Sequence, residues 1–193
     1  MKKIVKTLII TVSSALVLSS CVKDDDYTVP PVYEYLFIDG FDNWADWTKY
    51  SVSGTQEWVL DTQYGNPGNC AKMSGFQSGS SYTNEDWLIS PAIDLSSVST
   101  AALKFDTATK FSGNPIEIYI STDYSGSGNP NGATWNILSG TLSPSTGNYD
   151  WTGSGNIDIS AHTGSNVYIA FKYTSTTSES ATWEVDNVKI LKD

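Results

Sequence analysis

Val167–Tyr173 reads VYIAFKY, and Thr182–Leu191 reads TWEVDNVKIL. In the first stretch Val167 and every second residue after it are apolar or aromatic. This alternation is the period of two that places one face of a β-strand against a core. β-branched and aromatic residues, which are frequent in both stretches, also favour strands. We therefore expect two strands near the C-terminus, the first with a buried face.

The rest of the chain after residue 32 has the same character. Leu103–Asp106 and Ile116–Ser121 are two further expected strands, and in the second the isoleucines share one parity. Clusters of Gly, Ser, Asn, Thr and Pro, such as residues 125–132 and 143–148, separate the apolar runs as turns do. No long stretch keeps a helical period. Many short strands without helices between them predict an all-β protein, an antiparallel β-sandwich or jelly roll.

The beginning of the chain is different. Met1–Lys6 is basic, Leu8–Leu18 is apolar, and Ser19-Ser20-Cys21 closes the segment with small residues. The apolar part is shorter than the about 20 residues of a membrane-spanning helix, and it fits a cleaved export signal. Residues 18–21, Leu-Ser-Ser-Cys, resemble the lipobox of bacterial lipoproteins, which implies cleavage before Cys21 and lipidation of its thiol. An ordinary export signal with a cysteine nearby is the alternative.

We therefore divide the chain into a lipoprotein signal peptide (residues 1–20), a lipidated N-terminus and tether (21–32) and a jelly-roll domain (33–193). The tether contains Lys23–Asp26 and Pro30-Pro31 and has little to bury. Its acids are a solvated spacer or, by resemblance, the surface-export signal of some outer-membrane lipoproteins. The expected location is the outer membrane, with the protein anchored in lipid through Cys21 and exposed at the cell surface.

The charge of the chain excludes one class of partner. It has 11 lysines, no arginine and 21 acidic residues. Cleavage before Cys21 removes three lysines, which leaves 11 − 3 = 8 against 21 acids and a formal charge of 8 − 21 = −13. Such a surface repels a phosphate backbone, so we expect no nucleic-acid partner. Cys70 is the only cysteine besides Cys21, and its neighbours predict a small buried hydrophobe.

Two carboxylates fall among apolar residues of expected strands. Asp39 shares the parity of the phenylalanines beside it, and Asp186 shares that of Val188 unless a bulge lies at Asp186-Asn187. A buried ionised carboxylate without a partner is costly. Backbone N–H groups at a bulge could compensate it. A calcium ion, which takes about six to eight oxygen ligands, is the alternative.

The order of motifs along the chain resembles a known family. Asp39–Asn43 (DGFDN), Glu85–Pro91 (EDWLISP) and Val185–Ile190 (VDNVKI) resemble the cleaved-adhesin modules of gingipain-type proteases. Ile120–Gly126 (ISTDYSG) fits the related choice-of-anchor J group of secreted bacterial domains. The resemblance covers roughly residues 36–191.

This resemblance implies a jelly-roll β-sandwich of the galactose-binding or MAM-like type, often with a structural calcium near the first and last strands. Asp39 and Asp186 match acids of the adhesin modules, and Asp86 matches more loosely. Asn187 stands where those modules often carry a second aspartate. The expected calcium ligands are therefore Asp39, Asp86 and Asp186.

The sequence offers little for catalysis. His162 is the only histidine and lies in a polar turn, and there is no nucleophile elbow, zinc-binding helix or phosphate loop. A glycosidase needs only two carboxylates, so it stays open as the less favoured alternative. We expect a protein that is not an enzyme.

Aromatic residues point to recognition instead. The chain has seven tryptophans and eleven tyrosines, and Tyr124, Trp135, Tyr149 and Trp151 lie in polar, loop-like stretches. Exposed rings stack on sugars or form the hot spots of protein interfaces. The alternative is that these rings fold back and cover the ends of the sandwich. We expect a recognition or adhesion module for a carbohydrate or a host or matrix protein, or else a structural accessory subunit of a cell-surface glycan-uptake or protease complex.

Overall fold

The computed structural model of the protein describes residues 33–192. The predicted signal peptide, Cys21 and the tether lie outside the described residues. No helix within residues 33–192 is long and apolar enough to cross a membrane.

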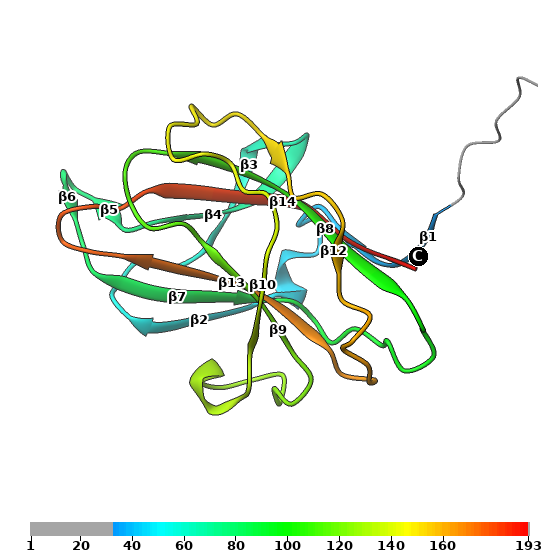
Figure 1. The fold of residues 1–193 in the computed structure, drawn as a ribbon. Helices are drawn as coiled ribbons and strands as arrows, with labels where there is room; N and C mark the ends of the chain where they lie inside the picture. Colours follow the sequence, from blue (N-terminus) through cyan, green and yellow to red (C-terminus); the bar gives the residue numbers. More distant parts are fainter. Residues whose placement is uncertain (1–32, 193) are drawn as a thin grey trace, which may run out of the picture. The chain divides into compact units, whose positions relative to one another are not determined.

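Residues 33–192 form two facing antiparallel sheets, so the predicted β-sandwich is confirmed (Figure 1). The seven-stranded sheet has the order β11 (Thr152–Gly153), β8 (Ala101–Lys110), β14 (Thr182–Lys192), β4 (Gly68–Ser74), β3 (Val59–Gly65), with β1 (Glu34–Asp39) beside β14 and β12 (Ile157–Asp158) beside β8. The five-stranded sheet has the order β10 (Asn136–Leu138), β9 (Glu117–Ser121), β13 (Tyr168–Ser175), β7 (Asn84–Ile89), β2 (Thr48–Ser53). A short hairpin, β5 (Phe76–Gln77) and β6 (Ser80–Ser81), and two 3-10 turns, η2 (Trp44–Asp46) and η3 (Pro130–Gly132), complete the elements of this part.

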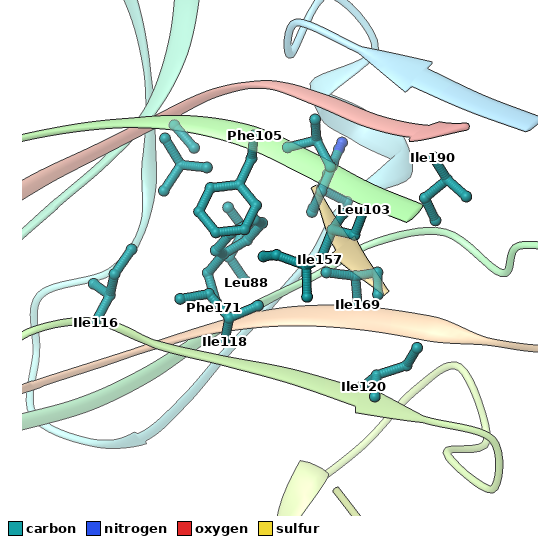
Figure 2. Packing of buried hydrophobic residues seen from close by; sticks show 14 of the residues in the cluster. Leu88, Leu103, Phe105, Ile116, Ile118, Ile120, Ile157, Ile169, Phe171 and Ile190 are labelled. Carbon is teal, nitrogen blue, oxygen red and sulfur yellow. The ribbon is translucent and has the colours of Figure 1, made fainter. Parts of the chain in front are cut away.

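The core lies between the two sheets and follows the alternation in the sequence. Figure 2 shows Ile118, Ile169 and Phe171 of the five-stranded sheet directed toward Leu103 and Phe105 of the other, and all are buried. The rings of Phe105 and Phe171 meet edge to face with centroids 5.2 Å apart. Each such side chain contributes about 1.5–3 kcal/mol through its removal from water.

The second face of the five-stranded sheet is also covered. Trp87, Tyr168 and Tyr124 form a separate buried cluster there, against which Trp135 and Tyr119 pack. The loop between β9 and β10 supplies Tyr124 and Trp135. This cover explains why β13 is buried on both faces, whereas the sequence predicts only one buried face.

A bulge at Asp186-Asn187, which the sequence left open as an alternative, is present and reorganises the last strand. β14 pairs with β4 up to Val185 and with β1 from Val188, and its register with β8 shifts between Asp186 and Lys189. Asn187 has a φ of 54°, in the left-handed region that Asn tolerates better than most residues. Val185 and Val188 therefore both reach the core. Asp186 therefore does not face the core together with Val188, whereas the alternation of an uninterrupted strand would place both side chains on the same face.

Candidate ligand-binding site

An ionic cluster lies on the outer side of the seven-stranded sheet. Lys72 of β4 is the register partner of Glu184 of β14 on one side and of Val59 of β3 on the other. Its ammonium lies 3.1 Å from Asp61 Oδ2 and 3.7 Å from Glu184 Oε1. One lysine thus joins two acids from the two neighbouring strands.

The burial of this cluster shapes its electrostatics. Glu184 is 2% exposed, and burial raises the pKa of its carboxyl, which the charge of Lys72 opposes only in part. Burial acts to lower the pKa of Lys72, but the hydrogen bond and the charge of Asp61 outweigh it, so that this pKa is raised. The lysine therefore stays charged between its two acids.

Aromatic rings stand around this cluster and enclose a hollow of ≈ 550 Å³. Tyr64 is 58% exposed, and its ring centroid lies 5.6 Å from the Lys72 ammonium. Tyr149 and Trp151 are half-buried and close the other side. Small polar groups among larger aromatic surfaces are what ligand sites in proteins generally offer. The hollow is lined by Gln63, Tyr64, Gly65, Lys72, Tyr149, Trp151 and Glu184.

The segment that carries Tyr149 and Trp151 is fastened to the sheet by its backbone. Tyr149 N–H donates to Thr109 O at 3.1 Å, and Ser143 N–H donates to Thr107 Oγ1 at 2.9 Å. β11 follows directly after Trp151 and pairs with β8. The two rings are therefore held in place before any ligand arrives, which lowers the entropic cost of binding.

The four predicted ligand-binding aromatics do not form one site. Tyr149 and Trp151 lie together in the hollow, whereas Tyr124 and Trp135 lie on the outer face of the five-stranded sheet. Tyr124 is 5% exposed and donates to Gly128 O, and Trp135 donates to Pro130 O. Their rings pack with centroids 5.4 Å apart. The loop has folded back onto its sheet, so the prediction that Tyr124 presents a free ring is wrong.

The sequence did not reveal the ionic cluster. Asp61, Lys72 and Glu184 are far apart in the chain and meet only through the register of β3, β4 and β14. The one available signal was Glu184, an acid between Trp183 and Val185 in an otherwise buried strand. Its position indicated a buried carboxylate but did not indicate that Lys72 is its ion-pair partner.

Two of the three predicted calcium ligands lie near each other. Asp39 and Asp186 line a hollow of ≈ 370 Å³ where β14 passes from β4 to β1, together with Asp42, Asn43 and Lys189. Asp39 Oδ2 accepts the Trp47 indole N–H at 3.0 Å, and its Oδ1 is buried without a hydrogen-bond partner.

Backbone N–H groups satisfy the second of these acids. Asp186 Oδ1 accepts from Asn187 N–H at 2.6 Å and Oδ2 from Asn66 N–H at 2.5 Å. Burial raises the pKa of Asp186 to about 6, against these hydrogen bonds. The compensation by a bulge that the sequence allowed is therefore realised at this residue.

The third predicted ligand, Asp86, is not part of this pair. It lies on β7 in the other sheet, opposite Tyr173 and Ser51, and it shares the inward parity of Leu88. Its carboxylate is 1% exposed, and neither oxygen has a hydrogen-bond partner. Burial raises its pKa to about 7. Within residues 33–192 no group of three acidic, histidine or cysteine side chains comes together, so the predicted set of three ligands is corrected.

Comparison with known proteins assigns the chain to a family. The family model described as a domain of unknown function (DUF5017) matches residues 39–192. The chain belongs to this family. No curated protein matches the chain.

The DUF5017 domain resembles solved adhesin and carbohydrate-binding domains. The K1 cleaved adhesin domain of Lys-gingipain from Porphyromonas gingivalis W83 is 18% identical, with a TM-score of 0.58 over 81% of this chain and 98% of that one. The K3 domain is 16% identical, with a TM-score of 0.54 over 83% and 99%. A family 11 carbohydrate-binding module from Clostridium thermocellum, in complex with a β-1,3-1,4-mixed-linked tetrasaccharide, is 19% identical, with a TM-score of 0.52 over 84% and 96%. The predicted resemblance to cleaved-adhesin modules and the sandwich fold are confirmed.

Proposed function

We propose that the DUF5017 domain is a non-catalytic recognition module that binds a carbohydrate in the hollow formed by Tyr64, Tyr149 and Trp151 over Lys72 and Glu184. The observation that carries the proposal is the combination of aromatic walls and an ionic floor in one hollow. The apolar face of a sugar ring packs on an aromatic ring, and its hydroxyl groups can donate to carboxylates and accept from an ammonium group.

The floor supports binding rather than hydrolysis. Both carboxylates share the Lys72 ammonium, whereas a glycosidase keeps one carboxyl group as an acid and the second as a separate base or nucleophile. Incubation of the protein with the sugars it binds should therefore release no shorter products. Measurable hydrolysis that an Asp61→Asn or Glu184→Gln variant abolishes would assign catalysis instead.

The fold gives this proposal a precedent. The clostridial module that shares the fold was solved with a mixed-linked tetrasaccharide, and the gingipain domains are named adhesins. Both support a recognition role.

The proposed place of action is the cell surface, with the module anchored in outer-membrane lipid through Cys21. Many copies held at one surface bind a polymer through multivalency, so weak individual contacts suffice. Mass spectrometry of the mature protein should find acyl groups on Cys21, and protease added to intact cells should remove the domain. An unmodified Cys21 or complete protection of the domain would each contradict this location.

We also propose a calcium ion at the junction of β1 and β14. Asp39 and Asp186 would hold it, with amide and carbonyl oxygens of the surrounding loops as further ligands. The supporting observation is the buried Asp39 Oδ1 without a partner beside the oxygen-rich hollow. Calcium should raise the melting temperature of the chelator-treated protein, and an Asp39→Asn variant should lose most of that gain. Identical melting curves with and without calcium would remove the ion from the proposal.

The carbohydrate proposal is tested with a matched pair of variants on a glycan array. Tyr64→Ala removes an exposed ring of the hollow, and Tyr35→Ala removes a similarly exposed ring of β1 that lines none of the described hollows (58% and 48% exposed). We expect Tyr64→Ala to weaken glycan binding by about tenfold, which corresponds to about 1.4 kcal/mol, and Tyr35→Ala to leave it unchanged. An array without any bound glycan, or equal binding by both variants, would contradict the proposed site. Binding only to protein ligands would favour adhesion.

A further inference from the structure

We propose that the hollow is one part of a longer groove that holds several units of a neutral polysaccharide chain. The inference rests on the proposed carbohydrate function and adds the length and the charge of the ligand to it. Two further hollows adjoin the first, and each shares residues or ring contacts with its neighbour.

The first connection runs along β4 toward β5. Lys72 lines the main hollow and also a second one of ≈ 400 Å³, which extends past Ser74 to Phe76. Phe76 in turn lines a third hollow of ≈ 400 Å³ with Phe111 and Ser180. Lys72, Ser74 and Phe76 are alternate residues, and an extended chain covers about 13 Å over this distance. The three hollows therefore adjoin one another over more than the length of a single sugar ring.

The second connection is a pair of aromatic rings. The ring centroids of Phe111 and Tyr149 lie 6.5 Å apart in an edge-to-face arrangement, and the Lys110 ammonium lies 5.5 Å from both. Tyr149 belongs to the main hollow and Phe111 to the third. The residues that line the third hollow belong to β5, β6, the segment directly after β8 and the turn between β13 and β14. β5, β6 and this turn lie together at one end of the sandwich (Figure 1). Aromatic rings thus line the path from the main hollow, where Trp151 lies, to this end.

The phenylalanines of the groove are unusually exposed. Phe76 is 56% exposed and Phe111 is 57% exposed. Phe111 also has a φ of 73°, a conformation that costs energy for a bulky residue and persists only where the surroundings hold it. Large exposed rings that gather on one surface mark a binding site. The strand ends thus hold two apolar rings in water where a ligand chain would cover them.

The charges along the groove select a neutral chain. Glu57, Glu179 and Glu184 line the three hollows, and Asp61 adds a fourth acid through Lys72. The lysines on this path are Lys49, which is paired with Glu57, Lys72, which is paired with Asp61 and Glu184, and Lys110, which lies against two rings. Three lysines thus stand against four acids, and the whole chain carries 21 acids against 11 lysines, so a polyanion such as a uronic-acid chain would meet a net negative surface. The groove therefore suits a chain of uncharged sugars.

The test is titration calorimetry of the whole mature protein with neutral polysaccharides (mixed-linked β-glucan, xylan, galactan and mannan) and their oligosaccharides from disaccharide to octasaccharide. For the polysaccharide that binds, affinity should rise with chain length well beyond the disaccharide. Phe76→Ala and Phe111→Ala should each weaken binding of the longest oligosaccharide by about tenfold and leave the shortest bound oligosaccharide unaffected. Ile137→Ala, which removes an equally exposed apolar residue from β10 (62% exposed), is the matched control and should have no effect.

The outcomes separate this inference from the function on which it rests. If the shortest and longest oligosaccharides bind equally and neither phenylalanine matters, the groove is refuted while the carbohydrate site stands. If no neutral sugar binds at all, both fail. Polygalacturonate that binds more tightly than every neutral polymer would overturn the charge argument.

Discussion

A buried carboxylate in the core gives the sharpest test of the structure. Asp86 points into the sandwich, 1% exposed, with no hydrogen-bond partner for either oxygen. Burial raises its pKa from the ordinary 3.8 to about 7. Between these values the native state holds a proton that the unfolded chain has released. Stability should therefore fall as pH rises through this window and level off above it.

The size of the effect follows from the shift. Each unit of pKa is worth about 1.4 kcal/mol, so the difference in proton binding between the native and unfolded states at Asp86 lowers stability by about 4 kcal/mol near pH 8 and by about 2 kcal/mol near pH 5, relative to acid pH. Asp86→Asn keeps the shape of the side chain and removes the titration. The stability of the variant relative to the unchanged protein should therefore rise by about 2–3 kcal/mol as the pH is raised from about 5 to about 8.

Thermal unfolding at the two pH values measures this gain. For a domain of this size it corresponds to roughly 5–10 °C in melting temperature. Asp186 and Glu184 titrate in both proteins and cancel in the comparison. Asp94→Asn, which changes an exposed turn, should show no gain toward alkaline pH. A constant difference between Asp86→Asn and the unchanged protein at both pH values would refute the reasoning, because it would mean that a donor or cation already compensates the carboxylate.

Two further predictions concern the core. Tyr173 accepts from Gly75 N–H and donates to Ala181 O, both at 2.8 Å, and the three groups are buried. Tyr173→Phe should cost about 2–4 kcal/mol in denaturant unfolding because a donor and an acceptor lose their partner together, and a loss no larger than that of an exposed Tyr82→Phe would contradict these bonds. Cys70 is fully buried, and burial raises the pKa of its thiol to about 12. A thiol reagent should therefore modify it only in denaturant, and rapid modification of the native protein would show that β4 is open.

The sandwich can be predicted from the sequence because single strands show an alternation of apolar and polar residues that marks their buried face. Val167–Tyr173 and Ile116–Ser121 show their buried faces without any long-range information, and both lie where expected. The site could not be predicted in the same way. Lys72 meets Asp61 and Glu184 only through the register of three strands, and register depends on the packing of the whole sheet. Tyr124 and Tyr149 have similar polar surroundings in the sequence, yet one is buried and the other lines a hollow.

The position of the hollow follows from the way the last strand is paired. β14 pairs with β8 along one edge. The bulge at Asp186 divides its other edge between β4 and β1. β4 therefore stands beside the half of β14 that carries Glu184, which brings Lys72 and Asp61 to that acid. The segment from Ser143 to Trp151 is tied to β8 on the opposite side of β14, so its rings reach over the same charges. A change that straightens the bulge, such as deletion of Asn187, would shift β1 relative to β4. It should damage the ligand site even though Asn187 does not line it, while truncation of Trp135, which covers the other sheet, should not.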